Sequence, residues 1–344
     1  SRLLGAQPTG CMRSIHRTRI AMQTLFSTIH IPSNQINAHL SDTLEVRVGI
    51  PQKAGKLAFH AFNEGYKAMV SANAFWNVKS AQFAVPTYSD LYDIPFALDS
   101  AGFVAHHLFK QKGKQDGIAG VYPWTYGQYV ALAADVSPDW WSQPDMCCEN
   151  EIAANQEEID YRVNATATLL EGTLRILYAW QDKMAMSHSE IDICNLLKPP
   201  VPIIQGRTAD DYLRSLDMLL EVWQRWEPWL APPRLIGLGS VCRRSTDHPD
   251  DGLYAILQRL DGKLPKGMAV HLFGVKGTAL EEVKKLPWIN STDSMAFDYG
   301  ARVKARKAGC SNTHQHRSAE MTRWMTKAES RITVKSGSQL GLIF

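Results

Sequence analysis

The sequence contains no apolar run long enough to cross a bilayer, so we do not expect a membrane-spanning protein. It also has no G-x-G-x-x-G segment after a predicted strand, which argues against a dinucleotide-binding domain. The six cysteines are irregularly spaced along 344 residues, unlike those of a secreted disulfide framework. We therefore expect a protein of a reducing compartment.

Residues 1–41 lack acidic side chains but contain several Arg, Ser and Thr residues. This composition is typical of a transit peptide or of a basic arm that contacts phosphate, and a variable extension is the alternative. The formal net charge of +3 permits a nucleic-acid partner without requiring one. We assign residues 1–43 to an N-terminal extension.

Short apolar runs alternate with longer segments of helical periodicity, which indicates β/α units around a parallel sheet. The predicted strands are 44–50, 94–99, 129–135, 201–205, 234–240, 268–275 and 288–293. The clearest predicted helices are 152–186, 208–226 and 278–286. The pattern predicts an α/β fold, a (β/α)₈ TIM barrel over residues 44–305, followed by a C-terminal appendage, residues 306–344.

Polar or small residues follow several of the apolar runs: Asp99, Asp135, Gln205, Gly237 and Asp293. In a barrel the C-terminal ends of the strands share one rim, so we expect these residues to face the same site. A helix cap or a turn is the alternative for each residue taken alone.

Paired carboxylates suit chemistry at an acetal or N-glycosidic carbon, where one attacks and the other transfers the proton of the leaving group. A further carboxylate and an amide can recognise the edge of a guanine-type ring. The residue types therefore favour glycosyl transfer, with a sugar hydrolase or a phosphosugar enzyme as alternatives.

Five segments also resemble motifs of the tRNA-guanine transglycosylase superfamily, in the same order, over roughly residues 44–305. "DSAGF" (99–103) is similar to D-S-G-G-F, "IIQG" (203–206) to V-Q-G, and "LIGLGSV" (235–241) to I-G-G-L. "HLFGVKG" (271–277) resembles L-x-G-V-G, and "STDSMAF" (291–297) resembles the segment that carries the nucleophile. Ala101 and Leu238 replace glycines of these motifs.

The resemblance implies a barrel enzyme that exchanges guanine for a 7-deazaguanine. By position, Asp293 would be the nucleophile that attacks the sugar C1′, and Asp99 the general acid and base. Asp135 would recognise the base, with Asp145 as the alternative occupant of that role. The matching motif positions imply these further substrate-binding residues: Ser100, Gly102, Phe103, Gln205, Gly206 and Gly237.

The tRNA enzymes of this superfamily carry a structural zinc site, and "CSNTHQH" (310–316) is the nearest counterpart here. It supplies Cys310, His314 and His316, and a tetrahedral zinc site needs a fourth ligand. Cys242 or His248 is the candidate for it. The alternative is that the histidines are exposed or contact phosphate.

The shortened zinc region and the "GSVCRR" segment look more like the branch of the superfamily that modifies DNA. This implies DNA as substrate, with tRNA as the alternative, and 7-cyano-7-deazaguanine or a relative as the incoming base. Arg243, Arg244, Arg302 and Lys304 are then candidate phosphate contacts, and a solvated basic helix face is the alternative for the last two. We expect the cytoplasm of a bacterial or phage-infected cell, with accessory proteins or a homodimer as partners.

Overall fold

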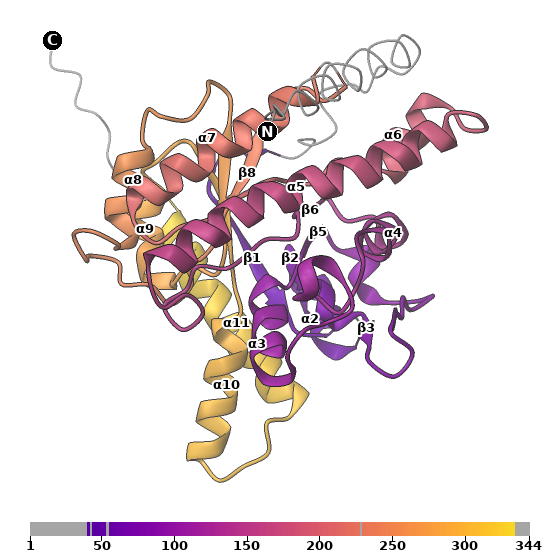
Figure 1. The fold of residues 1–344 in the computed structure, drawn as a ribbon. Coiled ribbons are helices and arrows are strands. Elements are labelled where there is room, and N and C mark those ends of the chain that lie inside the picture. The colour runs from indigo at the N-terminus through magenta and orange to yellow at the C-terminus, as the bar shows by residue number, and fades with distance from the viewer. Residues whose placement is uncertain (1–39, 42, 53–54, 228, 334–344) are drawn as a thin grey trace, which may run out of the picture.

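A computed structural model describes residues 40–41, 43–52, 55–227 and 229–333. Its main feature is a curled sheet of eight parallel strands in the order β6-β5-β2-β1-β10-β9-β8-β7 (Figure 1). The strands are β1 (Glu45–Ile50), β2 (Ala68–Ser71), β5 (Phe96–Asp99), β6 (Trp140–Trp141), β7 (Ile203–Ile204), β8 (Leu235–Leu238), β9 (Ala269–Leu272) and β10 (Ile289–Ser294). A parallel bridge between Ser142 and Val201 connects the two ends of the sheet. The result is a TIM-barrel-like architecture.

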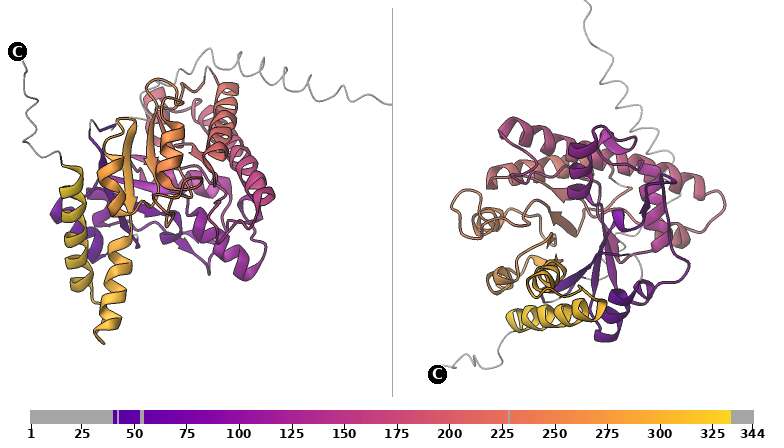
Figure 2. Two further views of the ribbon diagram at one scale, coloured as in Figure 1. Left: turned by 90° about the vertical axis from the view of Figure 1, so that its left-hand side faces the viewer. Right: turned by 90° about the horizontal axis from the view of Figure 1, so that it is seen from below.

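Helices surround the sheet, as two perpendicular views show (Figure 2). They are α2 (Lys56–Glu64), α3 (Gly102–Lys112), α4 (Tyr126–Val136), α5 (Gln156–Met184), α6 (Glu190–Leu196), α7 (Ala209–Arg225), α8 (Leu253–Leu260), α9 (Leu280–Val283), α10 (Ala296–Lys307) and α11 (His314–Ile332). A small antiparallel pair, β3 (Trp76–Asn77) and β4 (Gln82–Phe83), lies outside the sheet.

The strands are buried because both faces of the sheet are covered. All residues of β1, β10 and β8 are buried, although β10 is mostly polar. Several helices begin at residues whose side chains accept backbone N–H groups. Thr208 does so at α7 and Asn155 at α5, which confirms the helix starts predicted near these positions.

The predicted strand 129–135 is wrong, since these residues lie within helix α4. Thr125 and Gln128 form a reciprocal capping box at the start of α4, and this local signal outweighs the apolar run that follows. Two strands, β2 of four residues and β6 of two, were not predicted. The consequence is that Asp135 does not follow a strand.

Helix α11 lies within the predicted appendage but packs onto the barrel. Its buried residues Met321, Met325 and Ala328 join the main hydrophobic core, and Thr322 hydrogen-bonds His60 of α2 at 2.8 Å. Helices α10 and α11 lie side by side (Figures 1 and 2). Nearly all of the predicted N-terminal extension, 1–43, lies outside the described residues. No helix of the described part of the chain is long and apolar enough to cross a membrane.

Candidate active site

The two predicted catalytic carboxylates lie at the C-terminal ends of two strands of the sheet, β5 and β10. Asp99 is the last residue of β5, and Asp293 is the penultimate residue of β10. Both therefore face the C-terminal rim of the parallel strands, where barrel enzymes place their reacting groups. The negative charge of Asp293 contributes to the raised pKa of Asp99, so the two carboxylates interact through space.

Asp293 is held through one of its two carboxylate oxygens. Oδ1 accepts a hydrogen bond from the backbone N–H of Gly274 at 2.9 Å and lies 3.3 Å from Nε2 of His271. All hydrogen bonds that the described residues make to this side chain fall on Oδ1. Oδ2 is thus the oxygen left to react.

His271 lies on β9 and is fully buried. Its Nδ1 lies 2.8 Å from the Ser291 hydroxyl, and its ring packs edge-on between Trp140 and Phe273 with centroid separations of 4.8 and 4.6 Å. Burial lowers the pKa of His271, which favours the neutral ring. A neutral ring that accepts from Ser291 at Nδ1 can donate from Nε2 to Asp293.

Asp99 has the properties of a group that exchanges protons. Its Oδ2 accepts from the Ser71 hydroxyl at 2.8 Å and from the Ala101 N–H at 3.1 Å. Burial, assisted by the charge of Asp293, raises the pKa of Asp99 to about 6. The side chain can therefore gain and lose a proton close to neutral pH.

The turn after Asp99 explains two letters of the "DSAGF" segment. Ala101 has φ +64°, in the left-handed region that glycine favours, so a glycine at this motif position has a conformational reason. Gly102 begins α3, and a Cβ there would lie 2.6 Å from Oδ1 of Asp145 and 2.9 Å from the Tyr122 hydroxyl. Gly102 thus leaves room for Asp145.

Asp145 is buried in the loop after β6 and forms the centre of a polar network. Oδ1 accepts from the Ser100 hydroxyl at 2.8 Å, while Oδ2 accepts from the amide Nε2 of Gln205. The Tyr122 hydroxyl donates to the carbonyl of Asp145 at 2.7 Å and accepts from its N–H at 2.9 Å. Burial, together with the charge of Asp99, raises the pKa of Asp145 to about 7.

The network continues from Gln205 to the loop after β8. Oε1 of Gln205 lies 2.6 Å from the hydroxyl of Ser240, which also lies 3.1 Å from Oε2 of Glu149. Ser240 accepts from the N–H of Cys148 at 2.7 Å. Burial raises the pKa of Glu149. Four side chains from the loops after β6, β7 and β8 thus form one connected chain.

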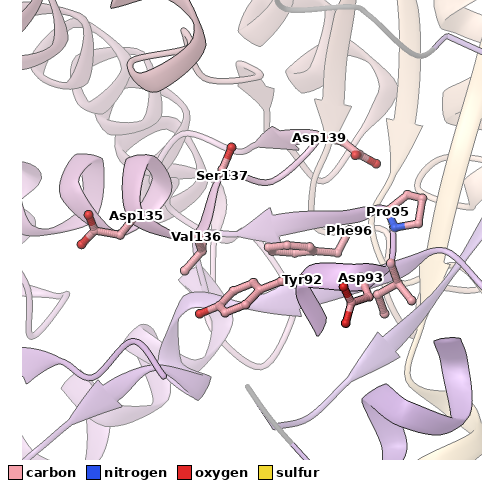
Figure 3. A pocket seen from close by; sticks show the side chains of 9 residues that line it. Tyr92, Asp93, Pro95, Phe96, Asp135, Val136, Ser137 and Asp139 are labelled. Carbon is pink, nitrogen blue, oxygen red and sulfur yellow. The ribbon is translucent and has the colours of Figure 1, made fainter. Parts of the chain in front are cut away.

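The structure corrects the predicted position of Asp135. This residue lies near the end of α4 and lines a pocket with Tyr92, Phe96 and Asp139 (Figure 3). The pocket is at the N-terminal ends of β5 and β6, away from the rim that carries Asp99. Asp145, the alternative, takes the place next to Ser100 and Gln205 instead. The mistaken strand 129–135 is the physical reason for the error.

Two further predicted substrate residues, Gly206 and Gly237, lie where backbones and side chains pack closely. A Cβ on Gly206 would lie 2.7 Å from Cβ of Asp211, and one on Gly237 would lie 2.5 Å from the Phe273 ring. Packing alone therefore accounts for both glycines, and their contact with a substrate stays a prediction.

Phe103, at the start of α3, lies at the same rim as Arg243. The Arg243 guanidinium lies 5.3 Å from the centre of the Phe103 ring, whose edge meets His107. Arg243 is exposed and pairs with Glu151 at 2.9 Å. Its contact with phosphate stays a prediction.

Arg244 is placed differently from Arg243. Its guanidinium donates to the backbone carbonyls of Gly206, Ser240 and Asp251, at 3.1, 2.9 and 2.8 Å. These bonds join the loops after β7 and β8, so Arg244 has a structural role in this arrangement.

Arg302 and Lys304 are exposed on α10 and pair with Asp298 at 3.5 Å and with Glu320 at 2.6 Å. Their contact with phosphate stays a prediction.

The predicted zinc ligands do not form a binding group in this arrangement. His316 Nε2 lies 3.0 Å from the Ala301 carbonyl, and Cys242 lies beside Gly274 near Asp293. Cys310 and His314 are both exposed. Among the residues that the structure describes, no three His, Cys, Asp or Glu side chains gather to hold a metal ion. We derive no chemistry from zinc.

Several residues of the site were not singled out from the sequence. His271 had one signal, a lone histidine within the apolar strand "AVHL". Ser71, Tyr122, Ser240 and Glu149 had none, because only the folded arrangement brings them to the carboxylates.

A comparison with protein families finds one match for the chain. The family model is described as DpdA, DeoxyPurine in DNA protein A, and it matches residues 69–340. That range begins in β2 and contains every carboxylate of the site. The comparison with curated proteins finds no match.

Proposed function

The chain belongs to the DpdA family, and we propose that it exchanges guanine in DNA for a 7-deazaguanine base, 7-cyano-7-deazaguanine or a relative. The family description names a deoxypurine in DNA, which supports DNA as the substrate. The observation that carries the proposal is the coupled trio of Asp293, Asp99 and Asp145 at one rim. These carboxylates supply a nucleophile, a proton carrier and a group that accepts hydrogen bonds from a base.

In the first half of the reaction, Oδ2 of Asp293 attacks C1′ of the target nucleotide and the glycosidic bond to guanine breaks. The departing guanine takes a proton from Asp99, whose raised pKa keeps part of the population protonated near neutral pH. The sugar is then covalently bound to Asp293.

In the second half, the incoming base gives its proton to Asp99, which the first half left ionised. Its ring nitrogen attacks C1′, and the bond between C1′ and Asp293 breaks. Asp293 and Asp99 thus return to their starting states, and one glycosidic bond replaces another, so the exchange balances by itself.

Asp145 and Gln205 recognise the base in this proposal. The N–H groups of a guanine-type edge donate to the Asp145 carboxylate, which Ser100 and Gln205 already orient. The target base has to leave the helical stack to reach this buried group. Phe103 and Arg243 lie at the rim where the displaced nucleotide enters.

Exchange of radiolabelled guanine into duplex DNA, with tRNA in parallel, tests the proposal. We expect incorporation into DNA and its loss in Asp293→Ala by at least about 10³-fold, together with loss of a trapped DNA adduct. Asp298→Asn, which alters a carboxylate on α10 outside the site, is the control. Full exchange by Asp293→Ala contradicts the assignment of the nucleophile, and incorporation into tRNA alone contradicts the assignment of DNA.

A further inference from the structure

The Ser240 hydroxyl has one proton but faces two acceptors. Its oxygen lies 2.6 Å from Oε1 of Gln205 and 3.1 Å from Oε2 of Glu149, and it already accepts from the Cys148 N–H. A hydroxyl donates one hydrogen bond and accepts two. One of its two neighbours must therefore donate to Ser240, and an ionised Glu149 cannot.

Only two arrangements satisfy every group in this chain. In the first, Glu149 carries a proton and donates to Ser240, Ser240 donates to Oε1 of Gln205, and the amide donates to an ionised Asp145. In the second, the amide is turned over, so Nε2 donates to Ser240 and Ser240 donates to an ionised Glu149. Oε1 of Gln205 then faces Asp145, which must carry the proton.

Both arrangements hold one proton on the two carboxyl groups together. If both carboxyl groups were ionised, two hydrogen-bond acceptors would face each other at one end of this series of side chains, with no proton between them. Such a contact is costly for buried groups. Burial raises the pKa of both Asp145 and Glu149, in agreement with a retained proton.

We propose that Asp145, Gln205, Ser240 and Glu149 form a relay that shares one proton, and that Glu149 holds this proton whenever Asp145 binds the purine edge. The inference rests on the proposed function, because it assumes that Asp145 faces the base. Glu149 is then a positioning residue, which acts on the base through Ser240 and Gln205.

The position of the proton decides which base edge fits. With the proton on Glu149, Asp145 is an acceptor for the N–H donors of a guanine-type edge. A carboxylate has about four acceptor positions, of which Ser100 and Gln205 occupy two. The Cys147 thiol, 3.8 Å from Oδ2, and the Tyr122 hydroxyl, 3.4 Å from Oδ1, make only long contacts, which the N–H donors of the base would replace. With the proton on Asp145, the site offers a donor and favours a purine with an acceptor at N1. The relay therefore contributes to base selection.

Conversion between the two arrangements conserves protons. Asp145 releases its proton to water, Glu149 takes one from water, and the Gln205 amide turns over. Several other titratable or charged groups act on the two carboxyl groups: Asp99, Glu151, Arg244, Tyr122, Tyr129, Tyr212, Cys147, Cys148 and Cys242.

Binding of 7-cyano-7-deazaguanine across a range of pH values tests the relay. At low pH Asp145 also becomes protonated and affinity falls. At high pH the relay loses its last proton, Ser240 then donates to ionised Glu149, and the Gln205 amide turns over so that its oxygen faces ionised Asp145, which lowers affinity again. Each limb has a slope of at most about tenfold for each pH unit, since at most one proton is linked to binding. Glu149→Gln donates permanently from its amide, so we expect it to bind the base well and to lose only the alkaline fall.

Glu151→Gln is the matched control, because it removes a nearby carboxylate that pairs with Arg243 outside the relay. It should keep both limbs. The range stays below the pH at which the base itself ionises. An alkaline fall in Glu149→Gln equal to that of the unmodified protein overturns the proposal.

Infrared spectroscopy of the ligand-free protein at neutral pH separates this inference from the proposed function. The relay predicts a protonated-carboxyl band, in addition to that of Asp99, in the unmodified protein and in Glu151→Gln, and this additional band is absent from Glu149→Gln. Identical bands in all three overturn the relay. If the band behaves as expected but no form of the protein binds the base, the relay stands and the proposed function fails.

Discussion

Nε2 of His271 lies 3.3 Å from Oδ1 of Asp293, on the same oxygen that accepts the Gly274 N–H. Ser291 lies 2.8 Å from the other ring nitrogen, so the imidazole is fixed at both ends. Two donors on one oxygen set the orientation of the carboxylate and leave Oδ2 without a hydrogen bond from the described residues. In the proposed reaction, His271 therefore positions Asp293 without contacting the reacting atoms.

Replacement of His271 by Gln should lower kcat about 10- to 100-fold and leave the KM for DNA nearly unchanged, because a misdirected nucleophile reacts slowly even when substrate binds normally. Single-turnover formation of the covalent adduct measures the effect. Ser291→Ala, which keeps the imidazole but removes its second contact, should have a smaller effect of the same kind. A change confined to KM contradicts the positioning role.

The release of guanine should slow as the pH rises above the pKa of Asp99, which burial raises to about 6. The protonated carboxyl is the form that donates to the departing base, and its fraction falls about tenfold per pH unit above the pKa. Rapid-quench measurement of labelled guanine release gives the profile. Asp99→Asn should be slow at every pH, and a profile that rises through this range excludes Asp99 as the acid.

Replacement of Gly102 by Ala should weaken base binding at least tenfold. The added methyl group would lie 2.6 Å from Oδ1 of Asp145, so the carboxylate has to move, at a cost of about 1–3 kcal/mol. Calorimetric titration with the base measures the change. Gly300→Ala on α10, where nothing lies within 4 Å of the new Cβ, is the control and should leave binding unaltered.

Replacement of Ala101 by Gly should raise the free energy of unfolding by about 0.5–1 kcal/mol. The left-handed backbone is costly for alanine, and the gain is reduced by the greater freedom of glycine in the unfolded chain. Thermal or urea unfolding measures it. Ala105→Gly, in the regular part of α3, should instead lower stability, and equal losses at both positions would contradict the argument from φ +64°.

We expect substitutions of Arg243 and Arg244 to have different effects on DNA binding and on stability, although the two residues are adjacent. Arg243→Ala should weaken DNA binding and reduce the slope of log affinity against log salt by about 0.9, with little change in stability, because it loses one phosphate contact. Arg244→Ala should lower the free energy of unfolding by about 1.5–3 kcal/mol, since buried carbonyls lose a charged donor. Equal effects of both variants on the salt slope would contradict this separation.

Part of the sheet could be predicted from the sequence because a parallel strand buried on both faces is often an uninterrupted apolar run, as in β8. Helix α4 presents the same kind of run, but its start carries a capping box formed by Thr125 and Gln128. Strand β6 consists of two tryptophans and was not recognised as a strand.

The carboxylates at strand ends were predictable for a related reason. Asp99 closes the apolar run of β5, and Asp293 lies in the segment that resembles the nucleophile motif, so both were identified. Asp145 lies in a loop after the unrecognised strand β6, so sequence reasoning kept it only as the alternative to Asp135. His271 and Glu149 depend on contacts with residues far along the chain, which no local pattern records.

The pairing of β1 with β10 has a consequence for how the protein is made. The first strand of the sheet has its partner on the strand that carries Asp293, near the far end of the chain. A ribosome-bound chain therefore holds β1 with one unpaired edge until almost all of it has been synthesised, which favours slow, late completion of folding. Completion of the sheet also brings Asp293, the proposed nucleophile, to the rim, so we expect that a chain without β10 forms no covalent adduct with DNA.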